Sequence, residues 1–321
     1  MTDVPRPGSD AAASDPGAAA TPDPGAAATG SPVVGSRRVL VTGAGGKTGL
    51  AILRALASRG IGVRGLVRGP DAAAGVVAVS GDADAAVQGD QRNVDDLRRA
   101  LTGCDAVYAI APNMTPHEQT MMAALTTAMR ATGVARLVYH SVVDPDEPAM
   151  PHHADKAEVE AMLAADDDLA WTVLRPNAYA QNLAGYLDGM HTGFVEVPYA
   201  TDRVSAFVDL RDVAEVAADV LADGSHPGEH LELSGPQLVS TDDVAAMAAD
   251  LLGHPVAARR IDPDTWAAAN AGLEPETRQR LTAMFRHYDR FGSPGDPTTL
   301  RRLLGREPAG ARDVLTGLLE G

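Results

Sequence analysis

A glycine-rich stretch, "VTGAGGKTG", holds the residues of this chain whose spacing most clearly predicts chemistry. It places Gly43, Gly46 and Gly49 three residues apart, between an apolar run and an amphipathic one. Between a strand and a helix, the first glycine permits a tight turn, the second lets the backbone approach a pyrophosphate, and the third lets the helix pack closely on the strand. The helix N-terminus then offers free N–H groups to an anion. We therefore expect a dinucleotide site that uses Gly43, Gly45, Gly46, Lys47, Thr48 and Gly49.

The residue that ends the next apolar run bears on which dinucleotide binds. Arg68 stands 19 residues after Gly49, about where an acidic residue would bind the ribose 2′-hydroxyl of NADH. A guanidinium at this place favours a 2′-phosphate, so we expect NADPH as the cofactor, with NADH less favoured. Arg64, on the same run, could assist. Asp90, after the third apolar run, is expected beside the adenine.

A second group of reactive side chains follows later strands. In an open α/β sheet, ligands lie across the carboxyl ends of the strands, where the small residues Ala109, Ala111 and Pro112 would let a nicotinamide ribose approach the backbone. Ser141 ends a later strand, and Lys156 begins the next helix with His152 four residues before it. A histidine titrates near neutral pH and could act as an acid. His153 is expected in a solvated loop, and His140 is expected to be a satisfied core histidine.

The elements that must position these residues alternate regularly. Short apolar runs rich in β-branched residues alternate with amphipathic segments, which predicts an α/β, Rossmann-type doubly wound parallel sheet. The stretch 70–84 is expected to be irregular, and Pro116 is expected in the first turn of its helix. The strands are expected at 37–43, 62–69, 85–90, 105–112, 135–141 and 170–176.

Composition divides the chain and excludes several functions. Residues 1–36 contain "DPGAAAT" twice and almost no large apolar residue, which predicts a disordered tail. We expect a nucleotide-binding domain at 37–176, and at 177–321 the last strands of the sheet with a smaller C-terminal substrate-binding cap. The net charge of −16 disfavours nucleic acid. A single cysteine fits a reducing, cytoplasmic compartment. We expect no metal and no membrane partner, and a monomer or homodimer that binds small molecules.

Taken in order, the motifs resemble the NmrA-like branch of the atypical short-chain dehydrogenases. The resemblance covers residues 37–235 and a C-terminal "LLGREPAG". It rests on "VLVTGAGGKTG", "VQGD", "GCDAVYAIAP", "ARLVYHSVV", "HHADKAEVEAML", "WTVLRPNAYAQNL" and "AFVDLRDVAEVAADVL". It implies a nicotinamide cofactor and a substrate-side loop with Asn177, Tyr179 and Asn182. Asn113, at an earlier strand end, is expected to face the same pocket.

The resemblance leaves the proton donor open. Standard short-chain dehydrogenases combine a serine with Tyr-x-x-x-Lys, whereas this chain has Ser141, Lys156 and, at the tyrosine position, His152. Lys156 could be a ribose clamp, with solvent protonating the acceptor. His152 or His153 could be the acid. Alternatively, the cofactor could be held without being consumed.

The resemblance implies an NAD(P)H-dependent oxidoreductase that delivers hydride to a quinone or another conjugated carbonyl. High Ala, Gly, Arg and Asp usage resembles a GC-rich actinobacterial proteome, which suggests natural-product metabolism, including aromatic polyketide tailoring. The alternative is a nicotinamide-sensing regulator that binds the cofactor without turnover.

Overall fold

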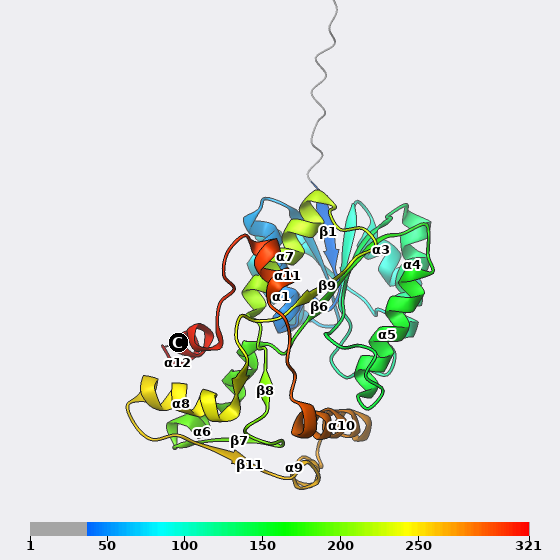
Figure 1. The fold of residues 1–321 in the computed structure, drawn as a ribbon. Coiled ribbons are helices and arrows are strands. Elements are labelled where there is room, and N and C mark those ends of the chain that lie inside the picture. Colours follow the sequence, from blue (N-terminus) through cyan, green and yellow to red (C-terminus); the bar gives the residue numbers. More distant parts are fainter. Residues whose placement is uncertain (1–36, 321) are drawn as a thin grey trace, which may run out of the picture. The chain divides into compact units, whose positions relative to one another are not determined.

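A parallel sheet of seven strands, in the order β3-β2-β1-β4-β5-β6-β9, lies at the centre of the computed structural model, which describes residues 37–320 (Figure 1). The order reverses between β1 and β4, and open α/β sheets bind ligands beyond the carboxyl ends of the strands at such a switch point. The predicted Rossmann-type fold is confirmed. The predicted tail, residues 1–36, lies outside the described residues.

The strands of this sheet fall where the apolar runs predict them. The helices between them lie on both faces, and Asn93 caps α3 by accepting hydrogen bonds from the N–H groups of Asp95 and Asp96. The strands are β1 (Arg38–Val41), β2 (Gly62–Val67), β3 (Ala86–Gln88), β4 (Ala106–Ala109), β5 (Arg136–His140), β6 (Ala170–Pro176) and β9 (His230–Leu233). The helices are α1 (Lys47–Ser58), α2 (Pro70–Ser80), η1 (Ala83–Ala85), α3 (Val94–Leu101), α4 (Glu118–Thr132), α5 (Pro151–Ala164) and α7 (Leu210–Asp223).

Two local predictions were wrong. The stretch 70–80 is helix α2, which begins with Pro70 in its first turn and ends at the left-handed Gly81. Only Val76 of this helix is buried, so its sequence carries no clear amphipathic period. Pro116 precedes the N-cap residue His117 and therefore lies outside the first turn of α4.

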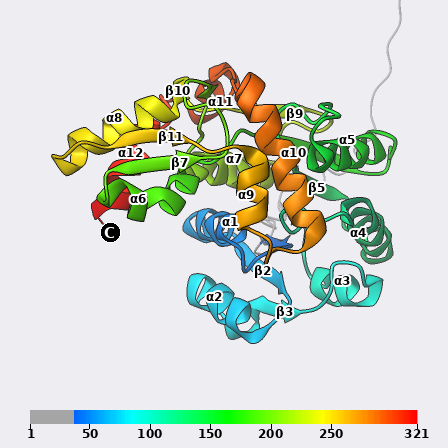
Figure 2. The same cartoon turned by 90° about the horizontal axis from the view of Figure 1, so that it is seen from below.

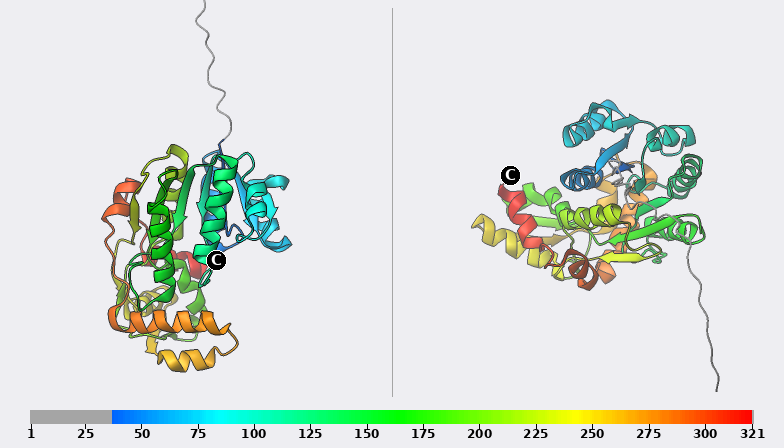
Figure 3. Two further views of the ribbon diagram at one scale, coloured as in Figure 1. Left: turned by 90° about the vertical axis from the view of Figure 1, so that its right-hand side faces the viewer. Right: turned by 90° about the horizontal axis from the view of Figure 1, so that it is seen from above.

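Two apolar layers cover the sheet. One layer contains buried residues of α1, α2, α7 and α11 (Thr298–Leu304) together with Tyr108 of β4 and Val138 of β5. The other contains α3, α4 and α5 together with Ala109 and Tyr139. Successive strand residues point to opposite faces, so neighbouring positions at the end of β5 serve different layers. Figures 1 and 3 show α4 and α5 on one side of the sheet, opposite α7.

A cap lies beyond the carboxyl ends of the strands (Figures 1 and 2). It has its own core, which includes Leu183, Val197, Val244 and Leu315. Two small sheets, β8 with β10 and β7 with β11, belong to it. Its remaining elements are η2 (Ala180–Tyr186), α6 (Leu187–His191), β7 (Phe194–Val197), β8 (Val204–Ser205), β10 (Val239–Ser240), α8 (Thr241–Leu252), β11 (Ala257–Arg260), α9 (Pro263–Ala269), α10 (Pro275–Phe291) and α12 (Ala311–Glu320).

Candidate active site

The glycine loop joins β1 to α1 with the geometry that a pyrophosphate needs. Gly43 has φ +58°, a conformation that L side chains rarely adopt, so the turn requires glycine here. A Cβ on Gly49 would lie 2.7 Å from Ala44 Cα, so this glycine permits the helix to pack against the loop. Gly46 is the N-cap of α1, and no side chain caps the helix. The N–H groups of the first turn are thus open to an anion, and the loop fits the predicted cofactor.

Hydrogen bonds join the glycine loop to the residue that follows β4, the strand on the other side of the switch point. The Thr42 hydroxyl donates to the Ile110 carbonyl (2.9 Å) and accepts from the Ile110 N–H (2.8 Å). These two bonds fix the loop beside the residues that follow β4. Here a small cavity of about 20 Å³ lies beside α4. Its lining includes Thr42, Gln91, Ala109, Ile110, Ala111, Glu118 and Tyr139.

Arg68 lies at the end of β2 with its side chain available. It is exposed, and within residues 37–320 no hydrogen bond or ion pair engages it. Asp90 pairs with Arg92 (2.7 Å), and the hydrogen bond from Arg92 lowers the pKa of Asp90 to about 2. Arg68 contributes to that lowering through its charge, which places it near Asp90. Arg64 does not assist, because its guanidinium donates to the carbonyls of Ala100 and Thr102 at the end of α3.

Lys156 reaches the carboxyl end of β5, held by a carboxylate that the sequence did not single out. Its Nζ donates to Glu118 Oε1 (2.7 Å) and to the His140 carbonyl (3.1 Å). The Tyr139 hydroxyl donates to the same Glu118 oxygen (2.8 Å). The lysine side chain is 14% exposed and the glutamate 6%, so the carboxylate is buried and the lysine is half-buried. A signal was available, because Glu118 shares its helical face with the buried Met122 and Leu125.

Ser141 ends β5 as predicted, but its side chain does not meet the lysine. The hydroxyl is fully buried and donates to Glu160, a carboxylate that also pairs with Arg175. The structure therefore gives Ser141 a role in holding β5, β6 and α5 together. This environment does not support the predicted catalytic part for Ser141.

The two histidines of α5 are buried in its first turn. His152 is 8% exposed, and its Nδ1 has no hydrogen-bond partner among the described residues. Burial, followed by the charges of His153, Lys156 and Arg280, lowers the pKa of His152 to about 3. A histidine that is neutral at physiological pH carries no spare proton, which disfavours His152 as the acid. His153 was wrongly placed in a solvated loop: it is 4% exposed, with Nδ1 2.9 Å from the Asp144 carbonyl.

The substrate-side residues divide into a structural one and an accessible group. Asn177 is buried, and its Nδ2 donates to the carbonyls of Ser293 (3.1 Å) and Pro294 (3.2 Å). It therefore anchors the loop after α10, and the prediction that it faces the substrate pocket was wrong. Asn182 is exposed and its Oδ1 accepts from Lys47 Nζ (2.7 Å), which joins the start of α1 to η2. Pro112 and the exposed Asn113 follow β4.

Tyr179 belongs to a hydrogen-bonded chain that reaches into the core. Its hydroxyl lies 2.6 Å from His140 Nε2, and His140 Nδ1 is hydrogen-bonded to the Tyr108 hydroxyl. Burial, and secondarily the charge of Lys156, lowers the pKa of His140 to about 3. The prediction of a satisfied core histidine is confirmed, whereas its link to Tyr179 was missed. Strand alternation offered a signal, because Tyr108 pairs with Val138, two residues before His140 on the same face.

Two kinds of site are missing from the part of the chain that the structure describes. No cluster of three or more His, Cys, Asp or Glu side chains could hold a metal there. Likewise, no helix between residues 37 and 320 is long and apolar enough to span a membrane.

Comparison with known proteins agrees with this geometry. A family model described as NAD(P)H-binding matches residues 43–224. A (4-alkanoyl-5-oxo-2,5-dihydrofuran-3-yl)methyl phosphate reductase of Streptomyces griseus is 29% identical over 86% of this chain and 95% of its own. An NAD(P)H azoreductase of Xenophilus azovorans is 32% identical, covering 68% of this chain and 75% of its own. The crystal structure of an NADPH-dependent quinone oxidoreductase of Escherichia coli superposes with a TM-score of 0.73 at 25% identity, covering 87% and 99% of the two chains. The chain belongs to the NAD(P)H-binding family, with the NmrA-like atypical short-chain dehydrogenases, and is an NAD(P)H-dependent oxidoreductase.

Proposed function

We propose that this oxidoreductase uses NADPH to reduce a planar, conjugated carbonyl compound, such as a quinone. The bound cofactor would supply a hydride. The glycine loop with Lys47 and Thr48 would hold its phosphates, Arg68 its 2′-phosphate, and Asp90 would lie beside its adenine. Ala109, Ala111 and Pro112 would border the nicotinamide ribose, with Lys156 near the ribose hydroxyls.

The observation that carries the choice of acceptor is a group of aromatic side chains in the cap. The Tyr199 ring lies 6.2 Å from that of Phe285 and 6.0 Å from that of Tyr288, and the Trp266 ring lies 4.7 Å from Phe285. All four side chains are half-buried, although aromatic residues make up only 4% of the chain. Aromatic faces prefer flat partners and contribute about 0.5–1.5 kcal/mol per pair beyond the buried area.

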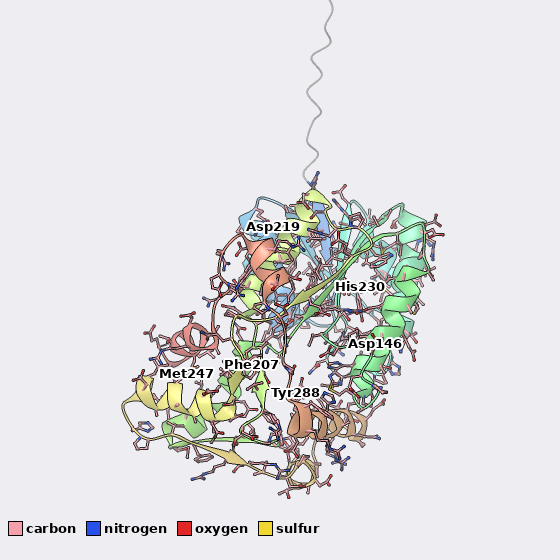
Figure 4. The ribbon with its side chains drawn as sticks, viewed as in Figure 1. Asp146, Phe207, Asp219, His230, Met247 and Tyr288 are labelled. Atoms are coloured by element: carbon pink, nitrogen blue, oxygen red, sulfur yellow. The ribbon has the colours of Figure 1, made fainter. Side chains whose placement is uncertain are left out.

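This aromatic group borders the carboxyl edge of the sheet. Burial and, secondarily, the charge of Asp144 raise the pKa of Tyr288, and the neighbouring His287 Nδ1 lies 3.8 Å from Glu147 Oε2, so this end of α10 lies beside the loop that follows β5. Figure 4 labels Tyr288 and Phe207 at the level where the sheet gives way to the cap. A flat acceptor resting on these rings would therefore meet the cofactor at the switch point.

The names of the similar proteins support the same chemistry. A 4-alkanoyl-5-oxo-dihydrofuran, an azo compound and a quinone are all conjugated acceptors of hydride. The Streptomyces griseus enzyme also supports a place for this chain in natural-product tailoring, with aromatic polyketides as one acceptor class that the cap rings would suit.

The test is NADPH oxidation by the purified protein in the presence of simple benzoquinones, naphthoquinones and α,β-unsaturated ketones. We expect oxidation well above the rate without protein for at least one planar acceptor, and slower oxidation of NADH. A protein that binds NADPH tightly but oxidises it with none of these acceptors would contradict the proposal.

A further inference from the structure

We propose that Tyr179 is the acid of this site: it donates its phenolic proton to the carbonyl oxygen of the acceptor, with His140 and Lys47 stabilising the phenolate that remains. This inference rests on the proposed function, because it requires an acceptor that has received a hydride. It assigns a proton donor to a chain whose His152 is neutral and whose Ser141 is occupied by Glu160.

The arrangement starts with a buried imidazole between two phenols. His140 is 6% exposed, and its two ring nitrogens face the hydroxyls of Tyr108 and Tyr179. A neutral imidazole has one N–H donor and one acceptor nitrogen. Its low pKa keeps His140 neutral at physiological pH, so one phenol must donate to the ring and the other must accept from it.

Tyr108 decides which nitrogen carries the proton. Tyr108 is fully buried, and His140 Nδ1 is the only partner of its hydroxyl among residues 37–320. A buried hydroxyl that does not donate leaves its desolvation uncompensated. Tyr108 therefore donates to Nδ1, and Nε2 carries the ring proton and donates it to the oxygen of Tyr179.

Tyr179 consequently keeps its own proton for a partner outside the core. Its side chain is half-buried and follows β6 at the carboxyl edge of the sheet. Lys47 is the first residue of α1, directly after the glycine loop, and its Nζ lies 5.6 Å from the centroid of the Tyr179 ring. The phenol is thus placed beside the cofactor loop with an ammonium above its ring.

The proton transfer balances with the hydride transfer. An acceptor that gains a hydride gains two electrons and one hydrogen nucleus, and its carbonyl oxygen becomes negatively charged. The O–H bond of Tyr179 breaks, and the proton bonds to that oxygen. The phenolate is stabilised by the Nε2–H of His140 and the ammonium of Lys47, and a solvent proton restores the phenol. Burial raises the pKa of Tyr179, so the phenol keeps its proton until a stronger base is present.

Tyr179 and Lys47 would together perform the role that a tyrosine and a lysine have in standard short-chain dehydrogenases. In this chain the two residues come from other elements of the fold. Lys47 comes from α1, and Tyr179 from the loop after β6, while Lys156 of α5 is already paired with Glu118. Tyr108 is then a positioning residue, because it acts only through the tautomer of His140.

The test combines turnover with a measurement that needs no turnover. We expect Tyr179→Phe to lower kcat by about 10²–10⁴ while leaving the NADPH Kd unchanged by calorimetry. Tyr186→Phe removes a hydroxyl from another half-buried tyrosine and serves as the control, with kcat retained. In the parent protein without cofactor, ¹⁵N NMR of the His140 ring should show the proton on Nε2, and Tyr108→Phe should reduce the population of that tautomer.

The outcomes separate this inference from the proposed function. A parent protein that turns over no acceptor overturns both. A parent protein that turns over, together with a fully active Tyr179→Phe, overturns only the role of Tyr179. A His140 ring with its proton on Nδ1 in the parent protein contradicts the hydrogen-bond order on which that role depends.

Discussion

Two lysines approach the end of β5 from opposite faces of the sheet, and their surroundings give them different roles. Lys156 is held by Glu118, with Tyr139 on the same carboxylate. Lys47 lies over the Tyr179 ring and donates to Asn182, and burial lowers its pKa. Sequence motifs identified both lysines and Tyr179, but neither the acidic partner that fixes the first lysine nor the contact of the second lysine with the Tyr179 ring.

Removing the charge of Glu118 should destabilise the protein. Glu118→Gln would leave the half-buried Lys156 ammonium without its counter-charge; the loss of one partner of a fully buried pair costs about 3–5 kcal/mol, and we expect a loss somewhat below that range. Urea unfolding would measure the loss. Glu196→Gln, at an exposed carboxylate of β7, is the matched control and should change the free energy of unfolding by less than about 0.5 kcal/mol.

The double variant Glu118→Gln, Lys156→Met makes this prediction specific to the pair. It removes both charges, so its loss should be smaller than the sum of the two single losses. If the loss in the double variant equals the sum of the two single losses, Glu118 and Lys156 do not stabilise each other.

Arg68 should set the preference for NADPH. Arg68→Ala removes a charge-assisted contact with the 2′-phosphate, worth about 1.5–3 kcal/mol, so the variant should bind NADPH and NADH with similar Kd. Calorimetry would show this. Arg54→Ala, an exposed arginine of α1, should keep the preference. Equal affinity of the parent protein for both cofactors would refute the assignment.

At the scale of elements, the sequence predicted where strands end better than where their side chains point. Ser141 and Asn177 do lie after β5 and β6, but their partners, Glu160 and Ser293, come from α5 and the loop after α10. Those contacts depend on tertiary packing, which a strand pattern does not contain. Helix α2 was missed because a nearly uniform Ala/Val stretch has no distinct buried face.

The buried histidines at the end of β5 and the start of α5 predict a loss of stability in acid. Burial lowers the pKa of both His140 and His152 to about 3, below the ordinary value near 6.5. The unfolded chain therefore binds more protons between these values, so the stability present above pH ~6.5 falls as the pH falls towards ~3. Each histidine can contribute up to about 1.4 kcal/mol per pH unit.

Urea unfolding at pH 7 and pH 5 would measure this dependence. His152→Leu should flatten it and leave NADPH-dependent turnover intact, since His152 is not the acid in this account. An unchanged pH dependence would show that His152 does not titrate on unfolding. A large loss of turnover would restore it as a candidate acid.

In the whole molecule, the central sheet forms the cofactor side and the cap forms the substrate side. The sheet builds the cofactor site, and its motifs follow one another in the sequence, so fold and cofactor could be predicted. The cap is assembled from short elements such as β7 and β11, which pair across about sixty residues of chain. Its aromatic rings come together only through that folding, so the substrate side could not be derived from local patterns.

The proposed function depends on the transfer of a hydride from NADPH to a conjugated carbonyl acceptor. The most direct measurement uses NADPH carrying deuterium at the transferable position, with an α,β-unsaturated ketone as acceptor and mass spectrometry of the product. We predict one deuterium on the carbon β to the carbonyl, and a second, solvent-derived hydrogen elsewhere in the product. A reduced product without deuterium from the cofactor, or no reduced product while NADPH stays bound, would show that this protein does not transfer hydride from NADPH to the acceptor.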